Sequence, residues 1–352
     1  MLRRGVCCTI RRVSESDVEV LIAVTFPEPL LERLRAVSPR LRVHHHPSRS
    51  FQELPEGLLS EVEVLYTSRR LPDPDVVPEL RWIQFHTAGV DRQASHPLVN
   101  SESVIVTTMS GASAPQMAEF VLLSILALGR RLLLMLEDQR SRRWAQDRFD
   151  RFTPTDLRGS TVGIVGYGSI GRETARLCRA FGAEVLATKR DLMRIEDEGY
   201  HLDGLGDARA DLVDRLYPPQ ALGSMVSLCD FLVVTVPLTS ETRGMLHEGI
   251  FKKMKPGAYL IDVSRGGVVD HSALVEALQD KRIAGAALDV YPVEPLPETS
   301  LLWDMPNVIL SPHVAGSSKY YFERAAGLFS ANLHRFLTEQ PLLNRYHPDR
   351  GY

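Results

Sequence analysis

The first hundred residues alternate short apolar runs with polar connections. Residues 18–24 mix β-branched side chains with little charge, which is typical of a buried strand, and a helical spacing follows at 29–37. Similar runs predict further strands at 41–45, 62–66, 81–85 and 104–107. Strands separated by short helical patterns indicate a parallel sheet built from βαβ units.

A longer apolar stripe follows at 114–143, with Pro115 in its first turn. Its apolar side chains recur at helical spacing at Phe120, Leu123, Leu126 and Leu128. The pattern predicts one long helix that joins two domains and serves as a hinge and a dimer surface. Plain core packing would give the same stripe.

From residue 160 the β/α alternation becomes regular. Strands are predicted at 161–165, 184–188, 230–236, 258–263, 285–290 and 308–310, with helical patterns in most of the gaps. The stretch 193–216 is acidic, contains glycine and has weak periodicity, so we expect an irregular surface excursion there. A closing helix is predicted at 320–337.

Composition narrows the classes of function. A chain of 352 residues suggests two domains, and 41 Lys and Arg against 44 Asp and Glu leave a net charge of −3. The basic excess of nucleic-acid and polybasic membrane binders is missing, and the apolar run 120–129 is too short to span a bilayer. The four cysteines have no CxxC spacing, so a disulfide framework and a zinc site are not expected and a cytoplasmic setting is favoured.

Two features near the N-terminus can each be interpreted in two ways. Residues 1–17 are expected to form a tail, although four arginines and no acid within residues 1–14 also resemble a transit peptide. The run His44-His45-His46 could suggest a metal site. Because consecutive side chains on a strand point to alternating faces, a solvated strand end is favoured and no metal is expected.

The sharpest local motif is Gly166-Tyr167-Gly168-Ser169-Ile170-Gly171, which follows a predicted strand and opens a predicted helix. Gly166 would permit the tight turn, Gly168 would let a pyrophosphate approach the backbone, and Gly171 would allow close packing of helix and strand. The N–H groups of Ser169 and Ile170 would face the phosphate at the helix N-terminus. The motif predicts dinucleotide binding, with a merely glycine-rich turn as the alternative.

The end of the next strand bears on the choice of dinucleotide. Thr188, Lys189 and Arg190 stand where an acid would bind the adenosine ribose 2′-OH. A Lys-Arg pair attracts a 2′-phosphate instead, so NADP(H) is predicted to be preferred and NAD(H) remains possible. In the alternative, the pair is a solvated strand end and Asp191 reaches back to the ribose.

Three later segments, 261–270, 287–295 and 310–316, each end a predicted parallel strand. Open α/β sheets hold their ligands at this edge. The segments contribute Arg265, Glu294 and His313, which could serve as an anion clamp, an acid and a proton carrier.

From about residue 157 to residue 316 these motifs resemble the D-isomer-specific 2-hydroxyacid dehydrogenase family. A weaker likeness continues N-terminally, where Thr87-Ala88-Gly89-Val90-Asp91 and Ser110-Gly111-Ala112 look like the family's substrate-side loops. The resemblance implies an α/β fold of two Rossmann-like, doubly wound parallel-sheet domains. A split flavodoxin-like substrate-binding domain (18–112 plus 317–352) would flank an inserted dinucleotide-binding domain (113–316), and the chain would form a homodimer.

The resemblance also implies roles for the catalytic residues. Arg265 matches the arginine that holds the substrate carboxylate and polarises the carbonyl. His313 matches the acid/base and also borders the cofactor, and Glu294 matches its partner, which favours the imidazolium form. The backbone N–H groups of Ala88 and Gly89 would hold the carboxylate opposite Arg265. In the alternative, these two residues only form an ordinary turn.

Further cofactor contacts come from the same resemblance. Asp289 matches the residue beside the nicotinamide carboxamide, and Val263 matches a backbone contact near the nicotinamide. The remaining matched positions, around the adenine and ribose and along the same cleft, are Val236, Pro237, Thr242, Ser264 and Gly316.

The implied reaction is hydride transfer between NAD(P)H and C2 of a small 2-oxoacid, with hinges near 111–115 and 316–318. Lys189 and Arg190 resemble the glyoxylate/hydroxypyruvate reductase branch, and Glu294 departs from the glutamine of the formate dehydrogenase branch. His86 would border the substrate pocket or simply be packed. A phosphite-type dehydrogenase and a dinucleotide-sensing, corepressor-like regulatory protein are the alternatives, because both are compatible with the same three side chains.

Overall fold

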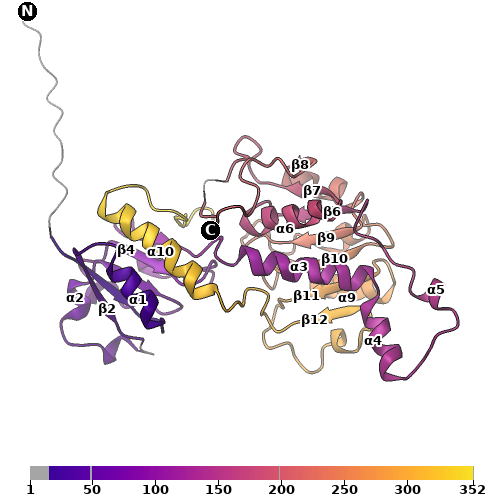
Figure 1. Cartoon of the computed structure of the whole chain (residues 1–352), viewed down its shortest axis with the longest axis horizontal. Helices are drawn as coiled ribbons and strands as arrows, with labels where there is room; N and C mark the ends of the chain where they lie inside the picture. Colours follow the sequence, from indigo (N-terminus) through magenta and orange to yellow (C-terminus); the bar gives the residue numbers. More distant parts are fainter. Residues whose placement is uncertain (1–15, 48–49, 198, 352) are drawn as a thin grey trace, which may run out of the picture. The chain divides into compact units, whose positions relative to one another are not determined.

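The computed structural model describes residues 16–47, 50–197 and 199–351, which form two units, each built on one parallel sheet (Figure 1). Unit 1 takes the described residues up to Thr87, then Arg92–Thr108 and Phe322–Tyr346. Unit 2 takes Ala88–Asp91, Met109–Tyr321 and the residues from His347 onward. Most of the expected N-terminal tail, residues 1–15, lies outside the described residues.

Unit 1 has a five-stranded sheet of order β2-β1-β3-β4-β5. Its strands are β1 Val18–Ile22, β2 Leu41–His45, β3 Val64–Thr67, β4 Trp82–Phe85 and β5 Ile105–Thr107. Its helices and 3-10 turns are α1 Glu28–Arg35, η1 Phe51–Glu53, α2 Leu58–Glu61, η2 Pro74–Val76, η3 Pro97–Asn100 and α10 Tyr321–Leu337. The five strands predicted in this region are confirmed, with ends that differ by up to two residues.

Aromatic rings fill the core of unit 1 beside α10. The ring of Phe329 lies 4.7 Å from that of Tyr66 and 5.3 Å from that of Trp82, measured between centroids. Trp82 also donates its indole N–H to Thr107 Oγ1 at 2.7 Å, so its one polar atom is satisfied inside the core. The helix near the C-terminus therefore completes the unit of the N-terminal strands.

Unit 2 has a seven-stranded sheet of order β12-β11-β10-β9-β6-β7-β8, and its pairings are all parallel. The strands are β6 Thr161–Val165, β7 Glu184–Thr188, β8 Arg215–Tyr217, β9 Phe231–Val234, β10 Tyr259–Asp262, β11 Gly285–Leu288 and β12 Val308–Leu310. The helices and 3-10 turns are α3 Ala114–Gly129, α4 Leu132–Arg140, α5 Arg148–Arg151, α6 Ser169–Ala180, η4 Pro219–Ala221, α7 Leu222–Val226, α8 Glu248–Phe251, α9 His271–Gln279 and η5 Leu301–Asp304.

Both faces of this sheet are buried, which explains its nearly continuous apolar strands. On β9, Phe231 and Val233 join the core under α3 and α6, whereas Leu232 and Val234 join the core under α7, α8 and α9. Helices α3 and α6 lie side by side on one face (Figure 1). The predicted α/β fold with two parallel-sheet units is confirmed.

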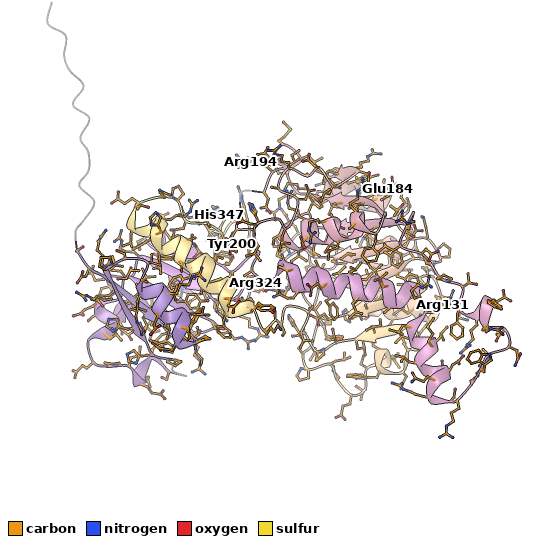
Figure 2. All side chains as sticks on the ribbon, viewed as in Figure 1. Arg131, Glu184, Arg194, Tyr200, Arg324 and His347 are labelled. Atoms are coloured by element: carbon orange, nitrogen blue, oxygen red, sulfur yellow. The ribbon has the colours of Figure 1, made fainter. Side chains whose placement is uncertain are left out.

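The predicted single helix at 114–143 is wrong. It is divided into α3 and α4 at Arg131, which has a left-handed φ of 56° and is labelled in Figure 2. A Cβ added to Gly129 would lie 2.6 Å from the Thr155 carbonyl oxygen, so the returning chain packs closely against the end of α3. The apolar stripe continues across this turn and therefore could not reveal it.

No described helix has the length and apolar character needed to cross a membrane. No group of three or more His, Cys, Asp or Glu side chains within the described ranges is arranged to hold a metal ion. Of the histidine run, His44 pairs with Glu19 at 2.6 Å on the neighbouring strand.

Candidate active site

The glycine-rich loop follows β6 and is fixed by both neighbouring strands. Gly166 has a φ of 103°, donates its N–H to Thr188 Oγ1 at 3.0 Å, and accepts a hydrogen bond from Thr235 Oγ1 at 2.8 Å. A Cβ at Gly166 would lie 2.7 Å from Val236 Cγ1. A side chain is therefore excluded both by the backbone conformation and by the lack of space.

The same loop leaves an open approach to the start of α6. A Cβ built on Gly168 would have no atom within 4 Å, whereas one on Gly171 would collide with the carbonyl oxygen of Gly166. Helix α6 begins at Ser169. This arrangement provides close helix–strand packing on one side and an exposed backbone at a helix N-terminus on the other, which suits a diphosphate.

The irregular stretch expected at 193–216 is anchored to this loop, and its last residues form the start of β8. Arg172 of α6 is buried and donates to the carbonyl oxygens of Asp207 and Ile195. Its guanidinium lies 4.8 Å from the centre of the Tyr167 ring, and Tyr167 donates its hydroxyl proton to Asp207 Oδ2 at 2.5 Å. Burial and this hydrogen bond raise the pKa of Tyr167.

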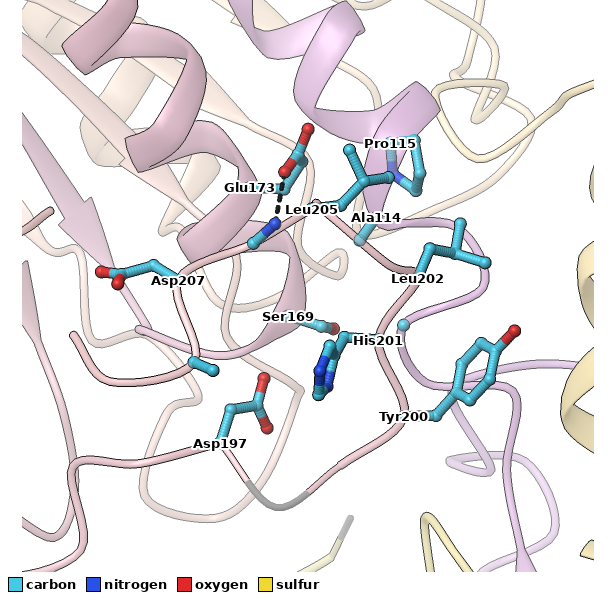
Figure 3. Close-up of a pocket in the computed structure, with 13 residues that line it drawn as sticks. Ala114, Pro115, Ser169, Glu173, Asp197, Tyr200, His201, Leu202, Leu205 and Asp207 are labelled. Atoms are coloured by element: carbon cyan, nitrogen blue, oxygen red, sulfur yellow. Dashed lines mark hydrogen bonds between the residues drawn. The ribbon is translucent and has the colours of Figure 1, made fainter. Parts of the chain in front are cut away.

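Figure 3 shows the gap between this stretch and the starts of α3 and α6. His201 lies beside Ser169 there, and the Gly206 N–H donates to Glu173 Oε2 at 2.7 Å. The cavity has a volume of only about 20 Å³. Since one ordered water needs about that much, the stretch is packed against the helix, and this cavity cannot hold a substrate.

The residues that follow Thr188 lie at the carboxyl end of β7. Partial burial, together with the charge of Arg172, lowers the pKa of Lys189. Arg190 pairs with Glu241 at 3.2 Å. Asp191, the acid that could have reached a ribose, accepts the Met193 N–H at 2.9 Å within its own turn.

The three catalytic candidates follow three neighbouring strands: Arg265 after β10, Glu294 after β11 and His313 after β12. A Cβ at Gly266 would collide with the Tyr291 carbonyl oxygen, so the first loop touches the second. The Tyr291 hydroxyl donates to the Ser311 carbonyl oxygen at 2.9 Å and ties the second loop to the third. The sheet therefore brings the three loops together.

His313 and Glu294 form a direct pair. Nδ1 of His313 lies 2.9 Å from both carboxylate oxygens of Glu294, and 44% of the imidazole side chain is exposed. With the Nδ1 proton donated to Glu294, the other ring nitrogen is the one available to a reacting group. His313 has a left-handed φ of 56°, a conformation that its loop must stabilise.

Asp289 supplies that stabilisation. Its Oδ1 accepts hydrogen bonds from Ser311 Oγ at 2.6 Å and from the Val314 N–H at 2.8 Å, and its Oδ2 accepts one from the Ala315 N–H at 3.0 Å. The carboxylate is buried and encircled by the loop that carries His313. The geometry thus assigns Asp289 a role in holding this loop, which the sequence did not suggest.

Arg265 lies against the first substrate-side loop. Its Nε is 3.2 Å from Asp91 Oδ2, and its Nη1 donates to the Ser264 carbonyl oxygen at 2.8 Å. A Cβ at Gly89 would collide with the guanidinium. The structure therefore brings Gly89, next to Ala88, together with Arg265, as the resemblance implied, and adds Asp91 as a counter-ion.

Asp262 is the second acidic residue that sequence reasoning missed. It ends β10 fully buried, and its Oδ1 accepts the Ser264 N–H at 3.0 Å and the Ser264 hydroxyl at 2.5 Å. Burial raises the pKa of Asp262 to about 7. An acid at a strand end, three residues before the partly exposed Arg265, was the available signal.

The remaining expected cofactor positions line the same edge of the sheet. Thr242 donates its hydroxyl proton to the Pro237 carbonyl oxygen at 2.6 Å, beside Val236, and so shapes that turn. Val263 is buried after β10, and the Gly316 carbonyl oxygen accepts a hydrogen bond from Gln116 Nε2 at 2.8 Å.

Comparison with known proteins agrees with this geometry. Residues 122–315 match the NAD binding domain of the D-isomer specific 2-hydroxyacid dehydrogenases. A glyoxylate reductase of Thermofilum pendens is 34% identical over 260 residues, which cover 74% of this chain and 72% of that protein. The chain belongs to the D-isomer specific 2-hydroxyacid dehydrogenase family.

Other members of the family extend the match to nearly the whole chain. A glyoxylate reductase of Thermococcus gammatolerans is 31% identical over 90% of this chain and 92% of its own length. A D-isomer specific 2-hydroxyacid dehydrogenase from Xanthobacter autotrophicus, solved with NADPH and MES, superposes with a TM-score of 0.79 at 30% identity and covers 96% of this chain and 100% of its own. An NADPH-dependent glyoxylate/hydroxypyruvate reductase from Sinorhizobium meliloti, solved with NADP and sulfate, superposes with a TM-score of 0.76 at 26% identity. The match covers 96% of this chain and 100% of that chain.

The predicted family and enzyme class are therefore confirmed. The protein is an NAD(P)-dependent oxidoreductase that interconverts 2-hydroxyacids and 2-oxoacids, and its NAD-binding domain is the one built on the seven-stranded sheet.

Proposed function

We propose that this dehydrogenase reduces small 2-oxoacids to D-2-hydroxyacids with NADPH, with His313 as the acid/base and Arg265 as the carboxylate clamp. The observation that carries the proposal is the His313–Glu294 pair, held at 2.9 Å on a loop next to the one that carries Arg265. An imidazole oriented by a carboxylate is suited to moving a proton, and a guanidinium is suited to holding an α-oxo carboxylate.

In reduction, the guanidinium of Arg265 and the N–H groups of Ala88 and Gly89 would hold the substrate carboxylate. The nicotinamide, when bound, supplies the hydride. Protonated His313 would donate to the carbonyl oxygen, and Glu294 would stabilise the imidazolium before this transfer. In oxidation, neutral His313 would accept the hydroxyl proton. Asp289 and Asp262 would keep the two loops in place, so the orientation is set before substrate binds.

NADPH is the proposed cofactor because two cationic side chains, Lys189 and Arg190, follow Thr188. A 2′-phosphate there would gain charge-assisted hydrogen bonds and would favour the charged form of Lys189. Asp191, bound within its own turn, would not reach a ribose. Similar structures solved with NADPH or NADP support this choice.

The proposed substrates are glyoxylate, hydroxypyruvate or a related 2-oxoacid. Relatives named glyoxylate reductase and glycerate dehydrogenase support the class. We further propose that residues 18–112 and 317–352 bind the substrate and that residues 113–316 bind the dinucleotide.

A cytoplasmic homodimer completes the proposal, without a nucleic-acid or membrane partner. Exposed apolar side chains after α3 support an interface there: Trp144 is 79% exposed and Phe149 is 78% exposed. Cys178 and Cys229 are buried free thiols, which supports a reducing setting.

The test is loss of NADPH absorbance, and separately of NADH absorbance, with glyoxylate, hydroxypyruvate, pyruvate and longer 2-oxoacids. We expect turnover with NADPH, and a fall in kcat of about 10²- to 10⁴-fold in His313→Ala with NADPH affinity retained. Faster turnover with NADH would refute the cofactor assignment alone. No turnover with any 2-oxoacid would refute the reaction and favour phosphite oxidation or a regulatory role.

A further inference from the structure

The irregular stretch 193–216 of unit 2 is bonded to the glycine-rich motif. Tyr167, the second residue of the motif, donates its hydroxyl proton to Asp207 Oδ2 at 2.5 Å. Arg172, which follows the last glycine of the motif, donates to the carbonyl oxygens of Asp207 and Ile195. Tyr167, Arg172 and Asp207 are all buried, so these bonds are shielded from water. The stretch is therefore fixed to the loop that suits a diphosphate.

The middle of this stretch lies against the starts of α3 and α6. A Cβ added to Gly111 would collide with the Tyr200 carbonyl oxygen, and the Gly206 N–H donates to Glu173 Oε2 at 2.7 Å. Between these two contacts along the chain, His201 lies beside Ser169, the first residue of α6 (Figure 3). The fold thus holds an imidazole at the start of this helix.

The same end of α6 is open to an anion. Its N-cap is Gly168, which has no side chain to accept a hydrogen bond from the first N–H groups of the helix. Gly168 is exposed, and a Cβ built on it would have no atom within 4 Å. Free N–H groups and the helix dipole both favour negative charge at this position.

The ring of His201 is oriented by its own turn. Its Nδ1 lies 3.2 Å from the Gly199 carbonyl oxygen, and the residue is exposed. With the Nδ1 proton donated to this oxygen, Nε2 is the nitrogen that can bind a ligand. Among the described residues that line the gap, His201 is the only one that can carry a positive charge.

The acidic side chains that line the gap already have partners. Glu173 pairs with Arg176 at 2.6 Å, Asp197 lies 3.6 Å from Arg172 Nε, and Asp207 is bound by Tyr167. The lining residues from the start of α3 carry no charge: they are Gly111, Ala114 and Pro115. Because these carboxylates are engaged elsewhere, a protonated His201 would be available to an incoming anion.

We propose that His201 binds the diphosphate of the dinucleotide, donating a proton from Nε2 to a phosphate oxygen. This inference rests on the proposed binding of the dinucleotide by this domain, with its diphosphate at the start of α6. The imidazolium would add a charge-assisted hydrogen bond to those from the N–H groups of Ser169 and Ile170. Since NADP and NAD share the diphosphate, His201 would strengthen the binding of both dinucleotides.

Binding is tested without catalysis, by calorimetric titration of NADP⁺, NAD⁺ and adenosine 2′-monophosphate at about pH 6, where histidine is mostly protonated. We expect His201→Gln to weaken binding of both dinucleotides about tenfold, the size of one charge-assisted hydrogen bond. Binding of adenosine 2′-monophosphate, which has no diphosphate, should not change. His334→Gln is the matched control, because His334 is an exposed histidine on α10 that does not line the gap.

The pH dependence of NAD⁺ binding provides a second measurement. The diphosphate of NAD⁺ keeps its charge near neutral pH, and NAD⁺ has no 2′-phosphate that would titrate there. Because a bound diphosphate favours the imidazolium form, the affinity of the wild type should rise about fivefold as the pH falls from about 8 to about 6. His201→Gln should remove this rise, whereas His334→Gln should retain it.

Gly168→Asp separates the role of His201 from the placement of the dinucleotide. Gly168 has an extended backbone and room for a side chain, so the variant should fold, and its carboxylate would compete with a diphosphate at the start of α6. We expect both dinucleotides to bind at least about tenfold more weakly. Unchanged binding would refute the placement and the proposal with it.

Weakened binding in Gly168→Asp together with unchanged binding in His201→Gln would overturn the role of His201 alone. A loss in His201→Gln that is confined to NADP⁺ and adenosine 2′-monophosphate would also overturn it, because the imidazole would then act on the 2′-phosphate. None of these results depends on turnover. An enzyme inactive with every 2-oxoacid would refute the proposed reaction and leave the titrations to decide on His201.

Discussion

The carboxyl edges of the two parallel sheets use charge in opposite ways. In unit 2, the carboxylates Asp262 and Asp289 are buried and accept hydrogen bonds from the loops that carry Arg265 and His313. In unit 1, the turn Ser68-Arg69-Arg70 at this edge presents arginine side chains that are exposed and make no bond to a described residue.

The difference follows from desolvation. A buried carboxylate is tolerated only when nearby donors replace its water, so it orders the chain around it. An exposed guanidinium keeps its hydration and remains available to a ligand. Acidic residues at the edge of unit 2 should therefore govern geometry and stability, whereas the exposed arginines at the edge of unit 1 should contribute little to either.

The largest effect is expected from Asp289→Ala. This change leaves the N–H groups of Val314 and Ala315 without their acceptor inside the protein and releases the loop that holds His313. We expect the free energy of unfolding to fall by about 3 kcal/mol and kcat to fall about 100-fold, with little change in KM for NADPH. Chemical denaturation and steady-state kinetics measure both.

A matched change in unit 1 provides the contrast. Thr67→Val removes the hydroxyl that donates to the Arg70 carbonyl oxygen, and it should leave kcat within about twofold and lower stability by about 1 kcal/mol. If Asp289→Ala retained the wild-type kcat, the assignment of Asp289 to loop positioning would be wrong.

The second effect is an opposite pH dependence of stability in the two units. Burial lowers the pKa of His86 from 6.5 to about 4, among the rings of Phe26, Tyr66 and Phe322. Below pH 6.5 His86 takes up a proton in the unfolded chain but stays neutral in the folded unit. The free energy of unfolding of unit 1 should therefore fall by about 3 kcal/mol as the pH falls from 6.5 to 4.

Asp262 behaves in the reverse sense. Its pKa is raised from 3.8 to about 7, so the folded state keeps a proton that the unfolded chain releases over this range. Unit 2 should therefore become less stable as the pH rises from 3.8 to 7, and Asp262→Asn should remove this slope.

Hydrogen exchange followed by mass spectrometry resolves the two units in one experiment. Peptides from β4 and from β10 are compared at about pH 5 and about pH 6.5 after correction for intrinsic exchange rates. Protection should rise with pH in β4 and fall in β10, and His86→Phe should abolish only the first trend. Parallel trends in both peptides would contradict the comparison.

The sequence predicted what depends on local pattern. Gly166 and Gly171 were interpretable because a tight turn and a close helix leave no space for a side chain, and Gly168 because an open backbone suits an approaching phosphate. The parallel strands followed from their apolar runs. The break at Arg131 was not predictable, because both helices share one apolar stripe. The role of Asp289 in holding the His313 loop was missed because its partners, at 311–315, come close to it only in the folded sheet. The role of Asp262 was missed although its partner Ser264 is near in the chain, because the sequence does not show that its carboxyl group is buried.

His86 illustrates the same limit. A packed or a pocket-lining histidine was equally compatible with the residues beside it in the chain. The structure places it against Tyr66, whose hydroxyl is 2.6 Å from Nδ1, with aromatic rings from distant segments around it. Packing partners far away in the sequence decided the outcome.

The smallest effect concerns an exposed arginine of unit 2 that does have a partner. Arg190 Nη2 lies 3.2 Å from Glu241 Oε2, and 40% and 71% of the two side chains are exposed. Glu241 would compete with a 2′-phosphate for this guanidinium, so Glu241→Gln should lower KM for NADPH about two- to threefold and leave KM for NADH unchanged, because exposed pairs contribute less than about 1 kcal/mol. Asp156→Asn, which breaks the exposed Arg130–Asp156 pair at 2.9 Å, is the control and should change neither constant. The gain should shrink as salt is added, since screening weakens both the competing pair and the phosphate contact. An equal gain with NADH would place Glu241 outside the recognition of the 2′-phosphate and make Arg190 a surface charge like Arg130.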